Sequence, residues 1–553
     1  MAMAEVKGGY GEDGIYRSLF PPVPIPLQTH HSLPALLFSG PLADPSNSSS
    51  PLLVDSTTGF TIHCGDFQRL AKSVASGLSS IVGVSQGDVV LLLLGNTVYF
   101  PILFAAILSI GAVATTANPA NTAAEIERQL RDSRAGFVVT MPDLVAKIGK
   151  NGQGFPTVIL DGENAGAKFF QDHPRFVRFE SLLAVDESKF PSAVRIRQGD
   201  PAALLYSSGT TGPSKGVLLS HGNLIAAVSI LASKPNDNDD KVVTFILLPL
   251  FHIAGLIYSG CMMIYLAATM VVVRKFDLLH MLQCIQRFKI TSLPMVPPIV
   301  VALLKHPAVE SYDLSSLKRA ASGAAPLAKE TLEAFLAKFP QIQEFSQAYG
   351  MTETTGLGAS GEAPFGSAGL LTANHEAKVT NVDTGKPLPP HSRGELWLRG
   401  PCIMQSYLNN PAATAATIDP EGWLHTGDIG YFDDDGFLFI VDRLKELIKY
   451  KGFQVAPAEL EALLLAHPGI ADAAVIPYPD DDAGEIPLAC VVRGSGEAGK
   501  SLSKDEVMDF IARQVASHKR IRAVTFVPSI PKSATGKILR KDLLQVTRSR
   551  SKL

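Results

Sequence analysis

Residues 207–216 read Ser-Ser-Gly-Thr-Thr-Gly-Pro-Ser-Lys-Gly and directly follow the apolar run at 202–206. A short buried strand that leads into glycines, hydroxyl residues and a lysine is suited to hold phosphate, because glycines let backbone N–H groups point inward. The stretch differs from a Walker A loop, since Ser214 precedes Lys215 and Gly216 follows it. Taken alone, it could equally be a surface turn rich in small residues.

Four further motifs follow in the chain. They are Gln-Ala-Tyr-Gly-Met-Thr-Glu at 347–353, His-Thr-Gly-Asp at 425–428, the segment 441–454 that ends in Lys-Gly-Phe-Gln, and Pro-Lys-Ser-Ala-Thr-Gly-Lys at 531–537. Together with the first stretch they resemble the acyl-CoA synthetase branch of the adenylate-forming superfamily. The sequence looks most similar to plant 4-coumarate–CoA ligases and their peroxisomal relatives, from about residue 67 to about 543. Five motifs in one order are far more specific than any one of them.

The composition limits the classes of function. The chain has 553 residues and a net charge of −3, so it is too long for one ordinary domain and offers no electrostatic case for a nucleic-acid partner. Its five cysteines are scattered, without a CxxC pair. We therefore expect neither a disulfide framework nor a zinc site. The protein is expected in a reducing compartment.

Two long stretches almost without charge could be mistaken for membrane spans. Residues 89–124 carry no charged side chain, and residues 242–273 carry only His252. Glycines and prolines interrupt both stretches, which favours strand, helix and strand in turn. Because buried parallel strands are apolar on both faces, we expect core elements and no integral membrane segment.

The alternation of apolar runs and amphipathic segments predicts an α/β protein. We expect a large N-terminal AMP-binding domain of doubly wound sheets over residues 1–443, which includes a small β-barrel-like subdomain where antiparallel strands begin near residue 390. A hinge at 444–446 would join it to a small, mobile α+β lid domain at 447–553. The last three residues, Ser551, Lys552 and Leu553, match the tripeptide that the peroxisomal import receptor reads. This predicts a peroxisomal protein with that receptor as partner; a basic solvated tail is the alternative.

The resemblance implies an ATP-dependent carboxylate–CoA ligase that uses ATP, CoA and Mg²⁺. An acyl-adenylate would form with release of pyrophosphate, and CoA would then form a thioester with release of AMP. Such an enzyme must neutralise phosphate charge and align the reactants. The small domain would rotate between the two steps and present a different face to one site.

The resemblance also assigns the nucleotide contacts. The β- and γ-phosphates would be held by Ser207, Ser208, Gly209, Thr210, Thr211 and Lys215. The adenine, the α-phosphate and the acyl group would meet Ala324, Gln347, Ala348 and Thr352. Glu353 would help to hold Mg²⁺, or serve only as a helix N-terminal carboxylate. Asp428 and Arg443 would bind the ribose, although a surface ion pair is the usual explanation for such a pair.

The remaining assignments concern the lid domain and the thiol. Lys537 would act in adenylation, and Lys445 would be the hinge residue. After rotation, Lys449 and Gln454 would act on the adenylate, and Lys451 and Gly452 would line the thiol channel. Lys275 would meet the CoA nucleotide, or be an ordinary surface lysine. His252 would gate thiol entry, or be a satisfied buried histidine.

One departure bears on the substrate. Relatives that use hydroxycinnamates typically carry a tyrosine two residues after the gating histidine, whereas this chain has Ala254, and only Tyr258 could partly fill the space. Ala348 also replaces a common glycine. We therefore expect a medium or long fatty acid or a cyclopentanone-containing jasmonate precursor in preference to 4-coumarate or another phenylpropanoid-like acid.

Two other functions stay open at this point. One is adenylation with a non-CoA acceptor or a luciferase-type oxidation, against which the Lys451–Gly452 pair argues. The other is a non-catalytic member of the fold, against which the retention of Lys215, Asp428, Arg443 and Lys537 argues.

Overall fold

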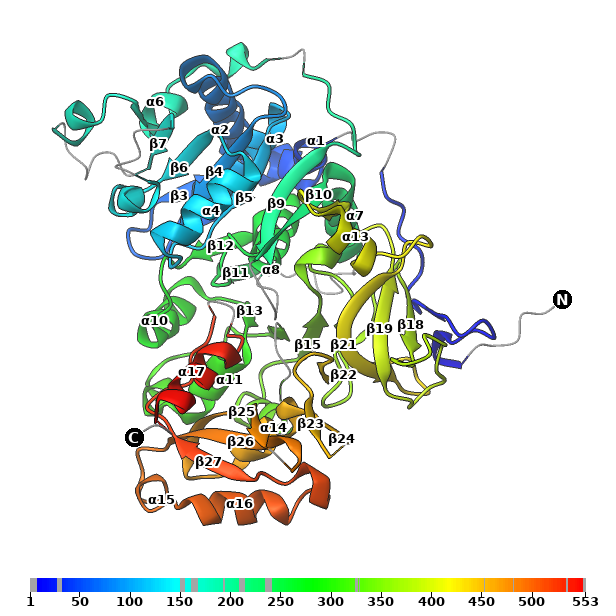
Figure 1. Cartoon of the computed structure of the whole chain (residues 1–553). Coiled ribbons are helices and arrows are strands. Elements are labelled where there is room, and N and C mark those ends of the chain that lie inside the picture. Colours follow the sequence, from blue (N-terminus) through cyan, green and yellow to red (C-terminus); the bar gives the residue numbers. More distant parts are fainter. Residues whose placement is uncertain are drawn as a thin grey trace.

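The computed structural model describes residues 7–26, 32–149, 155–160, 168–191, 194–207, 214–233, 241–323, 327, 329–451, 453–480, 482–533 and 536–550. Within these residues the strands form four sheets, and helices lie against them (Figure 1). This confirms the predicted α/β class, with a large N-terminal domain and a small C-terminal domain.

The first large sheet has eight strands in the order β20-β10-β9-β5-β4-β6-β7-β8. Their bounds are β20 (Ser406–Tyr407), β10 (Lys215–Ser220), β9 (Pro201–Ser207), β5 (Val113–Thr116), β4 (Val89–Leu93), β6 (Phe137–Thr140), β7 (Thr157–Ile159) and β8 (Phe176–Arg178). From β9 to β8 all neighbours are parallel, whereas β10 is antiparallel to β9. The strand, helix and strand predicted for residues 89–124 are confirmed as β4, the buried α3 (Phe100–Ser109) and β5.

The second large sheet has nine strands in the order β17-β16-β15-β14-β13-β11-β12-β2-β3. Their bounds are β17 (Leu370–Leu371), β16 (Ala359–Gly361), β15 (Glu344–Tyr349), β14 (Arg319–Gly323), β13 (Ser292–Met295), β11 (Val243–Ile246), β12 (Thr269–Val272), β2 (Pro51–Asp55) and β3 (Thr61–His63). The second uncharged stretch is likewise a strand, helical segments and a strand: β11, α8 (Ile253–Gly255), η8 (Leu256–Met262), α9 (Met263–Tyr265) and β12. Within the described residues, no helix combines the length and the apolar character needed to cross a membrane.

The antiparallel strands predicted after residue 390 belong to a five-stranded sheet in the order β1-β18-β19-β21-β22, to which two earlier segments of the chain contribute β1 and β18. Its strands are β1 (Tyr16–Arg17), β18 (Glu376–Thr380), β19 (Gly394–Arg399), β21 (Leu424–Phe432) and β22 (Leu438–Arg443). Alternate residues of these strands point into a separate small core, in which Tyr16 stacks on Phe432. This sheet carries Asp428 and Arg443 on neighbouring strands.

The C-terminal part begins after β22 and has a sheet of its own, with the order β24-β23-β26-β25 and β27 paired to β26. The strands are β23 (Ile448–Tyr450), β24 (Phe453–Val455), β25 (Ile470–Asp480), β26 (Gly484–Arg493) and β27 (Ala523–Phe526). Helices α14 (Pro457–Ala466) and α16 (Lys504–Ala512) pack with the sheet around a separate core, and α17 (Arg540–Arg550) follows β27. This part, orange to red in Figure 1, lies beside the end of the nine-stranded sheet.

Candidate active site

Two of the motifs singled out in the sequence, 207–216 and 347–353, lie at the carboxyl ends of parallel strands, as does Gly323. β9 ends at Ser207, β14 at Gly323 and β15 at Tyr349. Open α/β sheets bind their ligands outside these ends, where side chains and free backbone N–H groups meet. Lys215 pairs with Ser207 across β9 and β10, which fixes the lysine at this edge. The residues predicted between them, Ser208, Gly209, Thr210 and Thr211, and also Ala324, lie outside the described residues.

Lys215 and Glu353 are joined through a tyrosine that the sequence analysis did not single out. The Lys215 Nζ atom lies 4.4 Å from the centre of the Tyr407 ring. The Tyr407 hydroxyl donates a hydrogen bond of 2.9 Å to Glu353 Oε1. Burial raises the pKa of Tyr407, and the charge of Glu353 raises it further, so the phenol stays protonated and donates. The predicted phosphate-binding lysine and the predicted metal ligand therefore lie at one place.

Glu353 lies in the short 3₁₀ turn η10 (Thr352–Thr354) and is 5% exposed. Its backbone oxygen accepts a hydrogen bond from Met404 N, while its carboxylate turns to Tyr407. The described residues contain no group of three or more potential metal ligands around it. A single carboxylate suits Mg²⁺ that arrives with ATP, because this ion keeps waters and takes most other ligands from the phosphates.

Asp428 and Arg443 face each other across β21 and β22. Arg443 Nε lies 3.4 Å from Asp428 Oδ1, and the Tyr349 hydroxyl donates a 2.6 Å hydrogen bond to Asp428 Oδ2. Burial raises the pKa of Asp428, whereas Arg443, Tyr349 and Lys537 lower it. Because Asp428 is only 6% exposed, the pair is not an ordinary surface ion pair. Its carboxylate can accept two hydroxyl groups of a ribose once these partners adjust.

Lys537 reaches the same place from the C-terminal part. The preceding Gly536 lies against the start of α11 (Pro297–Lys305) in the N-terminal domain, since a Cβ atom there would be 3.6 Å from Pro298 and 3.7 Å from Val296. Burial lowers the pKa of Lys537, Arg443 lowers it further, and Asp428 and Glu353 raise it. Lys537 thus lies among the charged groups of the site.

Two lysines predicted for the second step, Lys449 and Lys451, do not belong to this buried group. Lys449 and Lys451, at β23 and just after it, are exposed, and neither is among the principal charges that shift the pKa of Asp428. Gly452 and the side chain of Gln454 lie outside the part of the chain that the structure describes. Lys445 is exposed and lies between the last N-terminal strand and the first C-terminal strand. The structure therefore brings Lys537 into the site and leaves the face around Lys449 outside.

Two buried nitrogen atoms at the site lack hydrogen-bond partners among the described residues: Nδ1 of His252 and Nε2 of Gln347. Burial lowers the pKa of His252 to about 4, and the nearby charge of Lys537 contributes, so the imidazole is neutral at pH 7. A core histidine with all its hydrogen bonds satisfied would not leave this nitrogen without a partner, so that interpretation does not fit His252. Gln347 is 8% exposed on β15, and the neighbouring Ala348 is exposed. Both orphaned groups are suited to meet a ligand.

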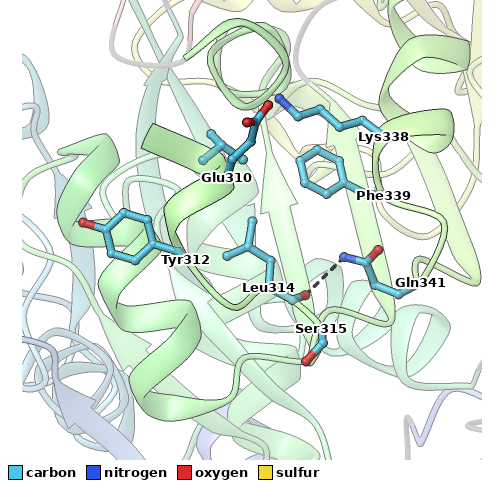
Figure 2. A pocket seen from close by; sticks show the side chains of 8 residues that line it. Glu310, Tyr312, Leu314, Ser315, Lys338, Phe339 and Gln341 are labelled. Carbon is cyan, nitrogen blue, oxygen red and sulfur yellow. Dashed lines mark hydrogen bonds between the residues drawn. The ribbon is translucent and has the colours of Figure 1, made fainter. Parts of the chain in front are cut away.

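Lys275 lies apart from this group. It is exposed in the turn after β12, as an ordinary surface lysine would be. A surface hollow of about 480 Å³ also lies apart from the site, beside η9 (Pro307–Ser311) and the end of α12 (Lys329–Lys338). Figure 2 shows its lining, in which Gln341 donates to the carbonyl of Leu314. None of the site residues lines this hollow.

Comparisons with known proteins cover nearly the whole chain. The family described as AMP-binding enzyme matches residues 46–408, and the AMP-binding enzyme C-terminal domain matches residues 459–537. The chain is 45% identical to the probable CoA ligase CCL5 of Humulus lupulus over 99% of both chains. It is 44% identical to the peroxisomal OPC-8:0-CoA ligase 1 of Arabidopsis thaliana over 96% of both.

Solved structures give the same result. ATP-bound MatB from Rhodopseudomonas palustris has a TM-score of 0.80 at 28% identity and covers 93% of this chain and 98% of that one. The anthranilate CoA ligase AuaEII in complex with anthranoyl-AMP has a TM-score of 0.83 at 25% identity, over 95% of this chain and 99% of that one. The chain therefore belongs to the AMP-binding enzyme family and is an ATP-dependent acyl-CoA ligase, that is, an acid–thiol ligase.

Proposed function

We propose that the enzyme activates a fatty acid or a cyclopentanone-containing jasmonate precursor, in preference to a phenylpropanoid-like acid, inside the peroxisome. The observation that carries the proposal is Ala254, a small and partly exposed residue two positions after His252. An aromatic ring there would shorten the space for the acyl group. The similarity to a relative named as a peroxisomal OPC-8:0-CoA ligase supports both the substrate class and the compartment.

In the first half-reaction, the substrate carboxylate attacks the α-phosphorus of ATP and pyrophosphate leaves. Lys215 and the glycine-rich loop would hold the leaving phosphates, and Gln347 the adenine. Asp428 and Arg443 would hold the ribose. Glu353 would hold Mg²⁺ together with phosphate oxygens, and the ion would neutralise phosphate charge. Lys537 would stabilise the negative charge that develops between the carboxylate and the α-phosphate.

In the second half-reaction, the CoA thiol attacks the acyl carbonyl and AMP leaves. Rotation about residues 444–446 would withdraw Lys537 and present Lys449, Lys451, Gly452 and Gln454. Phe453 supports a role for this face, because it is 54% exposed and stacks on His518 at 4.6 Å. An exposed aromatic side chain beside two lysines is suited to another molecule rather than to a core. Lys275 would meet the nucleotide part of CoA, and His252 would control entry of the thiol.

The peroxisomal address would be read from Ser551, Lys552 and Leu553, which lie outside the described residues. Import by the receptor for this tripeptide is tested by expressing the chain with and without its last three residues in plant cells. Loss of peroxisomal location on removal of the tripeptide supports the proposal. Unchanged location would contradict the assignment to this tripeptide.

The substrate is tested by a panel of acids in a pyrophosphate-release assay with Mg²⁺ and ATP, each with and without CoA. We expect medium or long fatty acids or a cyclopentanone-bearing acid to give the highest kcat/KM, with a CoA thioester as product. A higher kcat/KM for 4-coumarate would refute the substrate class. Release without a thioester would indicate a non-CoA acceptor, and no release with any acid would indicate a non-catalytic protein.

A further inference from the structure

Thr355, which follows the turn that carries Glu353, has an unusual backbone conformation. Its φ is +52°, in the left-handed region that a β-branched residue rarely adopts. The side chain is buried, and its hydroxyl donates a 2.6 Å hydrogen bond to the carbonyl oxygen of Cys402. A residue in such a conformation persists only where its surroundings hold it, and it often does so beside a functional group. Thr355 is therefore a candidate for a positioning role.

Two further hydrogen bonds join the same turn to the segment 401–408. The backbone N–H of Met404 donates to the carbonyl oxygen of Glu353 at 2.8 Å, and the Tyr407 hydroxyl donates to Glu353 Oε1 at 2.9 Å. Thr355 thus contacts the beginning of the segment and Tyr407 lies near its end, while both the backbone and the carboxylate of Glu353 are held between them. The orientation of this carboxylate therefore depends on where the segment lies.

The segment 401–408 is also held by the strand that carries Lys215. β20 pairs with β10, and the N–H of Leu408 donates to the carbonyl oxygen of Gly216 at 2.7 Å, directly after this lysine. The ammonium group of Lys215 lies over the ring of Tyr407. One short piece of chain therefore contacts both the predicted metal ligand and the predicted phosphate-binding lysine.

Asn223, from the first turn of α7 (His221–Ala232), fixes the backbone that Thr355 contacts. Its buried amide nitrogen donates to the carbonyl oxygens of Pro401 at 2.9 Å and Ile403 at 2.8 Å. These two carbonyls come directly before and after the one that accepts the threonine hydroxyl. The acceptor therefore lies on a well-held stretch of backbone, so the threonine bond can hold the turn in place.

We propose that Thr355 is a positioning residue for ATP with Mg²⁺, because its hydroxyl fixes the turn of Glu353 on the segment 401–408. Since the same segment is paired with β10, Glu353 and Lys215 are kept at a constant separation. The proposal rests on the proposed function, in which Glu353 holds Mg²⁺ together with phosphate oxygens and Lys215 holds the leaving phosphates. Mg²⁺ demands short bonds in nearly octahedral geometry, so a displaced carboxylate would bind it less well.

The test measures the affinity for ATP by calorimetry without an acid, so that no adenylate forms, in Mg²⁺ and in EDTA. Thr355→Val removes the hydroxyl and keeps the β-branched shape. We expect it to weaken binding of ATP with Mg²⁺ about tenfold and to leave binding in EDTA within about twofold, because loss of an outer partner acts on the metal ligand that it orients. Thr355→Ser keeps the hydroxyl and should restore the wild-type affinity.

Thr140→Val is the matched control. Thr140 is equally buried, on β6, and its hydroxyl also donates to a backbone carbonyl, that of Leu93 at 3.0 Å. Both valine variants should lose stability, but only Thr355→Val should lose affinity that depends on Mg²⁺. Combined with Tyr407→Phe, Thr355→Val should weaken binding by less than the product of the two single effects, because both changes act on Glu353.

The inference is overturned if Thr355→Val binds ATP with Mg²⁺ as tightly as the wild type, if it weakens binding equally in Mg²⁺ and in EDTA, or if Thr355→Ser binds as weakly as Thr355→Val. Effects that simply multiply in the double variant would also contradict it. Failure of the proposed role of Glu353 looks different, because Glu353→Gln would then bind ATP with Mg²⁺ as tightly as the wild type, and the inference would fall with it.

Discussion

Lys537 of the C-terminal domain and Asp428 of the antiparallel sheet lie close enough for each to shift the pKa of the other. The carboxylate of Asp428 raises the pKa of Lys537, and the ammonium group lowers the pKa of Asp428. In both residues burial has the larger, opposite effect, since it lowers the pKa of the lysine and raises that of the carboxyl. This is the orientation that the proposed role of Lys537 in the first half-reaction requires.

The lowered pKa of Lys537 predicts a specific pH dependence. In its proposed role at the α-phosphate Lys537 must be protonated, and its lowered pKa means that the proton is lost at a lower pH than from an ordinary lysine. We expect kcat/KM for pyrophosphate release to fall on the alkaline side at a pH below the ordinary lysine range. Thioester formation from supplied acyl-AMP should lack this fall. A common alkaline limb in both profiles would contradict the assignment.

Tyr407→Phe should weaken binding of ATP with Mg²⁺. The change removes the 2.9 Å hydrogen bond to Glu353 but keeps the ring under Lys215. A hydrogen bond to a charged group contributes about 1.5–3 kcal/mol, so the KM for ATP with Mg²⁺ should rise about tenfold or more. Tyr312→Phe, in the hollow of Figure 2, is the control and should change nothing. An unchanged KM in Tyr407→Phe would show that Glu353 does not depend on this tyrosine.

A cluster of ion pairs near the junction of the two domains predicts an effect of Arg540 on the stability of the fold. Arg540 is hydrogen-bonded to Glu461 at 2.8 and 2.9 Å and to Glu446 at 2.8 Å. Its side chain is only 15% exposed. Arg540→Gln leaves the buried Glu461 without its cationic partner, which costs about 3–5 kcal/mol in typical buried pairs. The thermal unfolding midpoint should fall, whereas Arg513→Gln, an exposed arginine in the same domain, should leave it unchanged.

This loss should depend on pH. Burial raises the pKa of Glu461 to about 7, with Arg540 opposing the shift. A carboxyl with a raised pKa binds more protons in the folded chain, so its contribution to stability falls as pH rises from its unfolded pKa of about 4.3 to its folded value of about 7. In Arg540→Gln the loss should be larger at pH 8 than at pH 6, because a protonated Glu461 needs no partner. An equal loss at both values would count against a charged Glu461.

The sequence predicted the structure reliably where a single motif is enough to define the local backbone or the position of a side chain. The uncharged run 89–124 was predicted as a strand, a helix and a strand because buried parallel strands are apolar on both faces, and the structure has them within one residue. Asp428 and Arg443 could be paired because each lies in a recognisable motif. Lys215 could be placed because its loop follows a buried strand.

Other parts of the site depend on contacts that no local pattern contains. Tyr407 reaches Glu353 only because the short strand β20 pairs with β10, and nothing in its neighbourhood marks it. Arg540 lies close to the end of the chain but contacts Glu446, so its partner is set by the packing of α17. The orientation of the small domain is set by its packing against the large domain, and the sequence predicted a role for two of its faces without indicating which of them would lie at the site.

Ala254→Tyr should move the substrate preference toward shorter aromatic acids. A ring at this position would occupy space beside His252, and overpacking of this kind costs about 1–3 kcal/mol. We expect kcat/KM for long or medium acids to fall about tenfold to a hundredfold, with that for 4-coumarate unchanged or higher. Ala254→Ser, which adds only a hydroxyl, should have a much smaller effect. An equal fall for all acids would indicate general damage and not a change of space.

The central claim is that one site is visited in turn by two faces of the small domain, the first visit with Lys537. It is tested most directly by measuring the two half-reactions separately in Lys537→Ala, with Lys541→Ala, an exposed neighbour, as the control. We predict that pyrophosphate release falls by about a hundredfold or more, while the supplied acyl-AMP is converted to the thioester at nearly the wild-type rate. An equal loss in both half-reactions would contradict the account.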